Sequence, residues 1–137
     1  MTIALIDKSR YLRGLLILAR KDNDISKIKK TIILEAGKRL GFSSEFCEEI
    51  LNILLHNECL CEEPAKFNSY AVAQAFIADG IILSFSGKSI IDAELNWLRQ
   101  AAEINSIDLK WFNEQVKKYS YLINTDVPTQ LTLYSII

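Results

Sequence analysis

Apolar side chains recur every three or four residues along most of this chain, which is the spacing of one face of an α-helix. Only five glycines and two prolines interrupt the pattern in 137 residues. The pattern therefore predicts an all-α protein. We expect six helices: five at about residues 5–19, 27–40, 70–78, 90–104 and 108–119, and one, the third in chain order, that begins at Ser43 or Ser44. Beyond them, residues 131–134 fit either a short seventh helix or an extended tail, and the helix is slightly favoured.

The third and fourth predicted helices differ in character. Ser43 or Ser44 is placed to cap the third helix, and glutamates in its first turns suit the positive end of the helix dipole. The fourth helix is rich in small apolar residues, so we expect it at the centre of the fold, followed by a Ser/Gly loop at 84–88. The positions expected to face inward are Phe46, Ile50, Leu51, Leu54 and Leu55 in the third helix, Ile91, Leu95, Leu98 and Ala102 in the fifth, and Leu109, Phe112 and Val116 in the sixth.

The chain contains an internal repeat. From about residue 25 onward, apolar, small and capping positions recur at a constant shift, which pairs Ile25 with Ile90, Ala36 with Ala101, and Ser43 with Asp108. Before that point a shorter shift matches best and places Asp22 on Asp79, so an insertion is predicted at about 81–88. Two pseudo-symmetric three-helix halves are therefore expected.

Length and composition are those of one globular domain that can bury a sizeable core. Half of the residues are apolar, which excludes an intrinsically disordered chain. No apolar run approaches the roughly 18 residues of a membrane span, and the first residues lack a signal-peptide pattern. Three cysteines suit a reducing compartment, so a cytoplasmic location is expected. The predicted single domain covers residues 1–137, with half-repeats at roughly 10–58 and 67–120 and a tail at 121–137.

Charge is unevenly distributed, although the net charge is only −1. Residues 1–41 contain ten basic and four acidic residues, whereas residues 42–63 contain six Glu and no Lys or Arg. Either the basic part faces an anionic partner, or the first helices pack beside the acidic third helix, which is favoured. The basic residues lack interleaved aromatic residues and the pI is about 5.9, so no nucleic-acid partner is expected.

A short motif occurs in both halves: an acidic turn, a helix, and a second turn before the next helix. Its residues are Ala78, Asp79, Gly80, Ile90, Glu94, Leu98 and Ala101 in the second half, and residues 22–26, Ala36, Gly41, Phe42 and Ser43 in the first. This motif resembles the helical repeat of the tellurite-resistance TerB-like family over about residues 10–120. The resemblance implies a compact all-helical domain associated with metal-ion stress, which in some members is proposed to bind divalent cations through clustered acidic residues. Such domains also occur as modules fused to others, such as J-domain co-chaperones.

The candidate site is one for a hard cation such as Ca²⁺ or Mg²⁺, which needs several oxygen ligands at one point. The carboxylates that the repeat could bring together are Asp79, Glu94, Asp92, Asp22 and Asp24. Two positions depart from the family pattern, because Lys29 replaces the glutamate of the first half and Asn23 stands where glycine is usual. Structural roles for these carboxylates, as turn, cap and dipole partners, are therefore favoured.

Other chemistry finds less support in the sequence. Cys47, His56, Cys59 and Cys61 lack the paired spacing of a structural zinc site. Residues 86–89 imitate the end of a phosphate-binding loop but lack its earlier glycine. With one His and no motif that activates a nucleophile, the chain is not expected to be an enzyme. A deep pocket with two facing carboxylates would change that expectation.

The leading hypothesis is a non-enzymatic TerB-like binding or stress-response module with a weak divalent-cation site. The alternative is a protein-interaction or assembly domain with no metal site. Such a domain would use an exposed loop at Phe85 or an apolar patch near Trp97 and Trp111. In both cases the expected partner is another protein or a second copy of the chain.

Overall fold

The computed structural model of the chain describes residues 2–22, 25–56, 61–86, 90–123 and 130–137. The described residues form six α-helices and one 3₁₀ helix, with no β-strand among them, as the sequence predicts. The helices are α1 (Leu5–Arg20), α2 (Lys27–Arg39), α3 (Ser44–His56), α4 (Tyr70–Phe85), α5 (Asp92–Ile104), α6 (Leu109–Ile123) and η1 (Thr132–Ser135).

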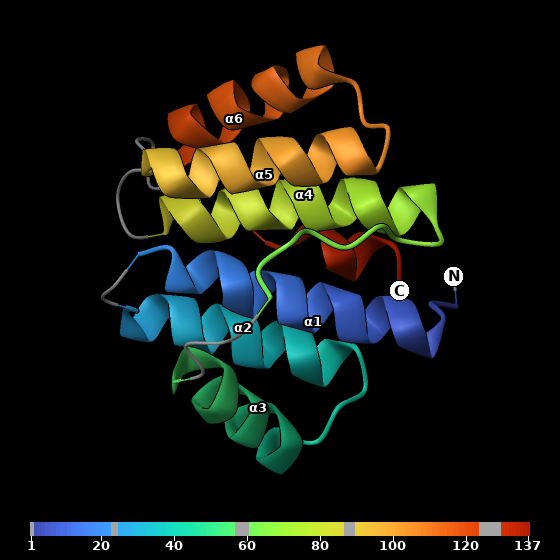
Figure 1. Cartoon of the computed structure of the whole chain (residues 1–137), viewed down its shortest axis with the longest axis vertical. Helices are drawn as coiled ribbons and strands as arrows, with labels where there is room; N and C mark the ends of the chain where they lie inside the picture. Colours follow the sequence, from blue (N-terminus) through green and yellow to red (C-terminus); the bar gives the residue numbers. More distant parts are fainter. Residues whose placement is uncertain (1, 23–24, 57–60, 87–89, 124–129) are drawn as a thin grey trace.

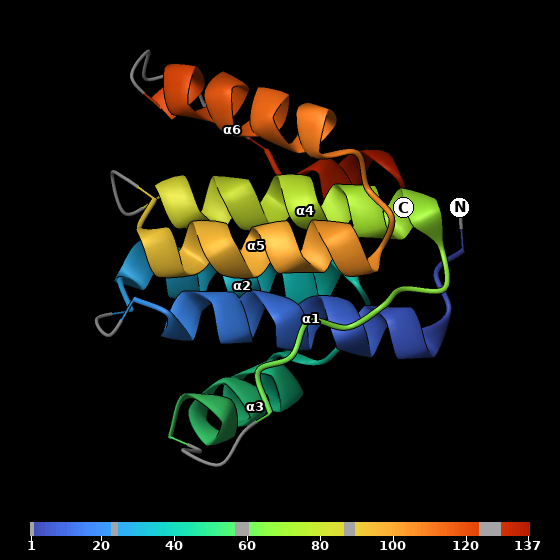
Figure 2. The ribbon, with the colours of Figure 1, turned by 45° about the horizontal axis from the view of Figure 1, so that its top comes forward.

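The helices form a bundle with α1 and α4 side by side at its centre (Figure 1). Helices α2 and α3 pack on α1, whereas α5 and α6 pack on α4. The two outermost helices, α3 and α6, therefore lie at opposite ends of the molecule, as both views show (Figure 2). The 3₁₀ helix η1 near the C-terminus packs against α4.

Helix α4 is longer than predicted. It was expected to end at residue 78, but it continues to Phe85, and residues 81–85 are all buried. A helix that is apolar on every side is stable where neighbours surround it, and α4 contacts α1, α5, α6 and η1. The predicted insertion at 81–88 and the loop at 84–88 are therefore wrong for the residues up to Phe85, and residues 87–89 lie outside the described part.

The helix boundaries repeat at one constant offset. The shift that pairs Ile25 with Ile90 also carries the first and last residues of α1 and α2 onto those of α4 and α5. The same shift carries the first residue of α3 onto the first residue of α6. The predicted change to a shorter shift before the first loop is thus wrong, because α4 and α5 are separated by no more residues than α1 and α2. The regular offset supports an internal repeat, and the pseudo-symmetry of the two halves in space stays a prediction.

The outer helices expose several side chains that were predicted to be buried. In α3, Cys47 and Leu51 face the core, whereas Phe46 is 42% exposed. Ser43 caps this helix by accepting a hydrogen bond of 3.1 Å from the backbone N–H of Phe46. Ile91, which precedes α5, and Leu109, the first residue of α6, are exposed as well. Helix α3 packs on α1 and α2 with its Cys47–Leu51 side, and Phe46 at the edge of its apolar stripe remains in solvent.

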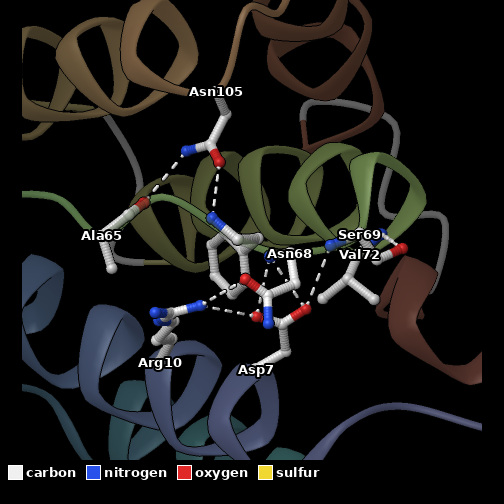
Figure 3. A network of polar contacts seen from close by, with 8 residues as sticks. Asp7, Arg10, Ala65, Asn68, Ser69, Val72 and Asn105 are labelled. Carbon is white, nitrogen blue, oxygen red and sulfur yellow. Dashed lines mark hydrogen bonds and ion pairs between the residues drawn. The ribbon is translucent and has the colours of Figure 1, made fainter.

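The 61–69 segment, which precedes α4, is held to the bundle by buried polar side chains (Figure 3). Asp7 of α1 accepts hydrogen bonds from the backbone N–H groups of Asn68, at 3.0 Å, and Ser69, at 3.2 Å. Asn105, at the end of α5, accepts one from the N–H of Phe67 and donates one to the carbonyl of Ala65. These bonds satisfy backbone groups of a segment that has no regular structure of its own.

Candidate functional site

Two of the predicted metal ligands, Glu94 and Asp22, lie on either side of a lysine. Glu94 is in the first turn of α5 and Lys29 is in the first turn of α2, and both side chains are 1% exposed. The Lys29 Nζ atom is 3.1 Å from Glu94 Oε2 and 3.4 Å from Asp22 Oδ2. The ammonium group therefore neutralises these carboxylates from a point between them.

This arrangement has a clear electrostatic cause. A buried carboxylate is costly unless a partner charge and further hydrogen bonds compensate for its lost hydration. The second oxygen of Glu94, Oε1, accepts a hydrogen bond of 3.1 Å from the N–H of Ile91, the residue before α5. Both oxygens of Glu94 are therefore satisfied by the protein. A divalent cation at this point would have to displace Lys29 or lie against its positive charge.

Asp79 is satisfied in a different way. This carboxylate, in the middle of α4, is fully buried and accepts a hydrogen bond from the hydroxyl of Tyr11. It also accepts bonds from the side chain of Thr132, at 2.8 Å, and the N–H of Leu133, at 3.1 Å. Burial raises the pKa of Asp79 to about 6, although these hydrogen bonds act to lower it. Asp79 thus attaches η1 to the central helix.

The four predicted ligands among the described residues do not come together at one point. Asp92 is exposed at the start of α5, and Asp24 lies outside the described residues. Asp79 is bonded to α1 and η1, whereas Glu94 and Asp22 share Lys29. In the described part of the chain, no three His, Cys, Asp or Glu residues gather in a group that could hold a metal ion.

The cysteines and the histidine are also dispersed. Cys47 is buried in α3, Cys61 and His56 are exposed, and Cys59 is not among the described residues. The Cys47 sulfur packs against Gly37 of α2, where an added Cβ would lie 2.5 Å from it. Cys47 therefore serves as a small apolar side chain at the α2–α3 contact.

A groove between α1 and α3 is a surface that the sequence analysis did not identify. It has a volume of about 210 Å³ and is lined by Ser9, Leu12 and Arg13 of α1, by Phe42, and by Phe46, Ile50 and Leu54 of α3. The Phe42 and Phe46 rings stack at its edge with their centroids 5.2 Å apart. We refer to this feature as the α1–α3 groove.

One signal in the sequence could have indicated this groove. The apolar positions of α3 include Phe46, Cys47, Ile50, Leu51 and Ile53, which together cover a face wider than one narrow contact can bury. We expected Phe46, Ile50, Leu51, Leu54 and Leu55 to face inward and made no prediction for Ile53. The structure buries only the Cys47–Leu51 side and leaves Phe46 and Ile53 exposed, at 42% and 49%.

The surfaces that were predicted for protein binding lie elsewhere and are largely covered. Phe85 is 6% exposed at the end of α4, so the predicted exposed loop at this residue is wrong. Trp97 is 5% exposed, and its indole N–H donates a hydrogen bond of 2.6 Å to the carbonyl of Glu62. Trp111 is half-buried. Phe85 and Trp97 are thus covered, whereas Trp111 lines a shallow pocket of about 280 Å³ between α4, α6 and η1.

A second cavity, of about 140 Å³, lies between α1, the 61–69 segment and α5, with Phe67 and Trp97 in its wall. Of the described residues that line it, Glu63 is the one that carries a carboxylate. A pair of facing carboxylates would favour an enzyme, and the described residues that line this cavity contain no such pair.

No family model, curated protein or solved structure matches the chain. The resemblance to the TerB-like family therefore stays a prediction from the motif residues. None of the described helices is both long and apolar enough to cross a membrane.

Proposed function

We propose that this protein is a non-enzymatic helical module, of the TerB-like type that its motifs resemble, and that it acts by binding another protein through the α1–α3 groove. The observation that carries the proposal is an apolar groove flanked by an exposed aromatic ring, Phe46, on an outermost helix. Exposed apolar surface is unfavourable in water, and a contiguous patch with a polar rim is typical of a binding site.

The size of the groove favours a protein side chain over a small molecule. Ligand pockets usually enclose about 300–1,000 Å³ and bury most of the ligand. The α1–α3 groove is smaller, at about 210 Å³. Such a groove suits one or two anchoring side chains from a partner, and apolar anchors of this kind dominate the energy of many interfaces.

Cation binding has weaker support from the geometry. The two buried carboxylates of the predicted set are bonded to groups of the protein itself, Glu94 to Lys29 and Asp79 to Tyr11. We therefore base the proposed function on the groove, without a metal.

The proposal can be tested by selecting peptides from a display library of short helices on the wild-type protein. Phe46→Glu is expected to weaken the selected peptides at least tenfold, because it places a charge in the apolar contact. Tyr121→Glu is the matched control, since Tyr121 is an exposed aromatic residue on α6, and it is expected to bind normally. Circular dichroism checks that both variants fold. Failure to select any binder, or equal binding to both variants, would contradict the proposal.

A further inference from the structure

The apolar strip of the α1–α3 groove follows one helix in a regular way. Phe46, Ile50 and Leu54 line it at intervals of four residues along α3. At a rise of about 1.5 Å per residue, they span roughly 12 Å, or about two helical turns. An amphipathic helix that inserts residues i, i+3 or i+4, and i+7 into a groove matches this length.

The solvent edge of this strip is acidic. Glu45 and Glu49 each precede a lining residue by one position, which places them about 100° around α3 from Phe46 and Ile50. Both glutamates are exposed, as is Glu48. Among the described residues, no ion pair joins these three glutamates to the rest of the bundle.

The surrounding sequence does not neutralise this edge. Residues 42–63 contain six Glu and no Lys or Arg. On the opposite wall, Arg13 is the one basic residue among the described residues that line the groove, and it donates a hydrogen bond of 2.8 Å to the carbonyl of Cys61. The groove therefore presents an apolar floor with negative charge along its α3 side, and its partner should carry the opposite charge there.

We propose that the α1–α3 groove binds an amphipathic helix of another protein whose apolar face is bordered by Lys and Arg residues. This inference rests on the proposed function and adds the chemistry of the partner. The apolar residues of the partner helix occupy the strip between Leu12 and Leu54. Its basic residues lie over α3, where they pair with Glu45 and Glu49. The acidic edge repels an acidic helix and an anionic membrane surface, so charge sets the choice of partner.

The test compares two labelled helical peptides with the same apolar residues, one bordered by Lys and Arg and the other by Glu. Fluorescence anisotropy is expected to give at least tenfold tighter binding of the basic peptide at low salt. The difference should shrink as salt is raised, because salt screens exposed charges. Glu45→Gln/Glu49→Gln is expected to weaken the basic peptide by about two- to thirtyfold, because it removes two exposed pairs worth roughly 0.2–1 kcal/mol each. Glu103→Gln/Glu114→Gln, which changes exposed glutamates of α5 and α6, is the matched control and should have no effect.

The outcomes separate this inference from the proposed function. Equal binding of the two peptides, with loss of both in Phe46→Glu, overturns the charge preference and leaves the protein-binding groove in place. Absence of binding by either of these peptides, together with failure to select any other binder, overturns both proposals. A wild-type dimer that Phe46→Glu converts to a monomer assigns the groove to a second copy of the chain and overturns the basic helix as its partner.

Discussion

At the scale of single residues, two buried carboxylates are stabilised in opposite ways. Glu94 lies beside the ammonium of Lys29, at 3.1 Å. Asp79 has neutral donors on α1 and η1, and burial raises its pKa to about 6. A charged partner and a set of neutral donors respond differently to substitution and to pH, so the two sites can be distinguished by experiment.

Lys29→Met should leave Glu94 buried without a partner charge. Loss of one partner of a buried pair typically costs about 3–5 kcal/mol in the free energy of unfolding, which urea denaturation measures. Lys29→Met/Glu94→Gln removes both charges and should recover part of this loss, whereas Lys30→Met, on the exposed neighbour, should change little. A double variant no more stable than Lys29→Met would argue against the pair.

The Asp79 carboxyl should make the protein less stable as the pH rises from about 4 to 6. Its pKa is raised from 3.8 to about 6, so the native state holds a proton that the unfolded state has lost. The contribution of this group is therefore fully present below pH 4 and is lost by about pH 6, with a size of roughly 3 kcal/mol.

Urea denaturation of the wild type and of Asp79→Asn between pH 4 and 7 checks this effect. The stability of the wild type relative to the variant should fall across this range, because asparagine does not titrate. A relative stability that instead rises with pH would mean that the hydrogen bonds from Tyr11, Thr132 and Leu133 outweigh the burial of the charge.

The sequence could identify Asp79 and Glu94 as unusual acidic positions, but it could not identify their partners. The donors to Asp79 come from Tyr11, near the start of the chain, and from η1, near its end, so both are distant from Asp79 in the sequence. Local periodicity reports which face of a helix is apolar and carries no information on contacts at such separations. The same holds for the pairing of Lys29 with Glu94 across the two halves.

At the scale of elements, the boundaries of most helices followed from apolar periodicity and capping residues. Helix α4 was the exception, because Gly80 and Ser84 resemble the punctuation of a loop. Burial by four neighbouring elements outweighs the low helix propensity of these residues. The outward face of α3 was missed for a related reason: a stripe of apolar residues does not reveal how much of it a neighbour covers.

The contact between the two central helices depends on Gly14. A Cβ atom at this position of α1 would lie 2.5 Å from the ring of Phe76 in α4. Gly14→Ala is therefore expected to lower the free energy of unfolding by about 1–3 kcal/mol, although alanine is the better helix former. Thermal or urea unfolding measures the loss.

Phe76→Leu should relieve this clash, so the effect of Gly14→Ala is expected to be smaller in the Phe76→Leu background than in the wild type. Ser9→Ala, at an exposed position of α1, controls for helix propensity and should be neutral or slightly stabilising. A Gly14→Ala variant as stable as Ser9→Ala would contradict the close α1–α4 approach.

At the scale of the whole molecule, the bundle places its two outer helices at opposite ends (Figure 1). The central helices are enclosed, whereas α3 packs on α1 and α2 and keeps an apolar edge in solvent. The all-α class and the single bundle could be predicted from the sequence. The wide apolar face of α3 indicates that part of it stays in solvent. The position of the α1–α3 groove does not follow from that face, because it depends on the angle at which an outer helix rests on its neighbours.

The central claim is that a partner protein binds in the α1–α3 groove. Methyl NMR of the protein, titrated with a peptide selected on it, tests this claim most directly. We predict shift changes centred on the methyl groups of Leu12, Ile50 and Leu54, with the methyl groups of the exposed Ile28 on α2 unchanged. Changes centred on α2 or α6, with Leu12, Ile50 and Leu54 unaffected, would contradict it.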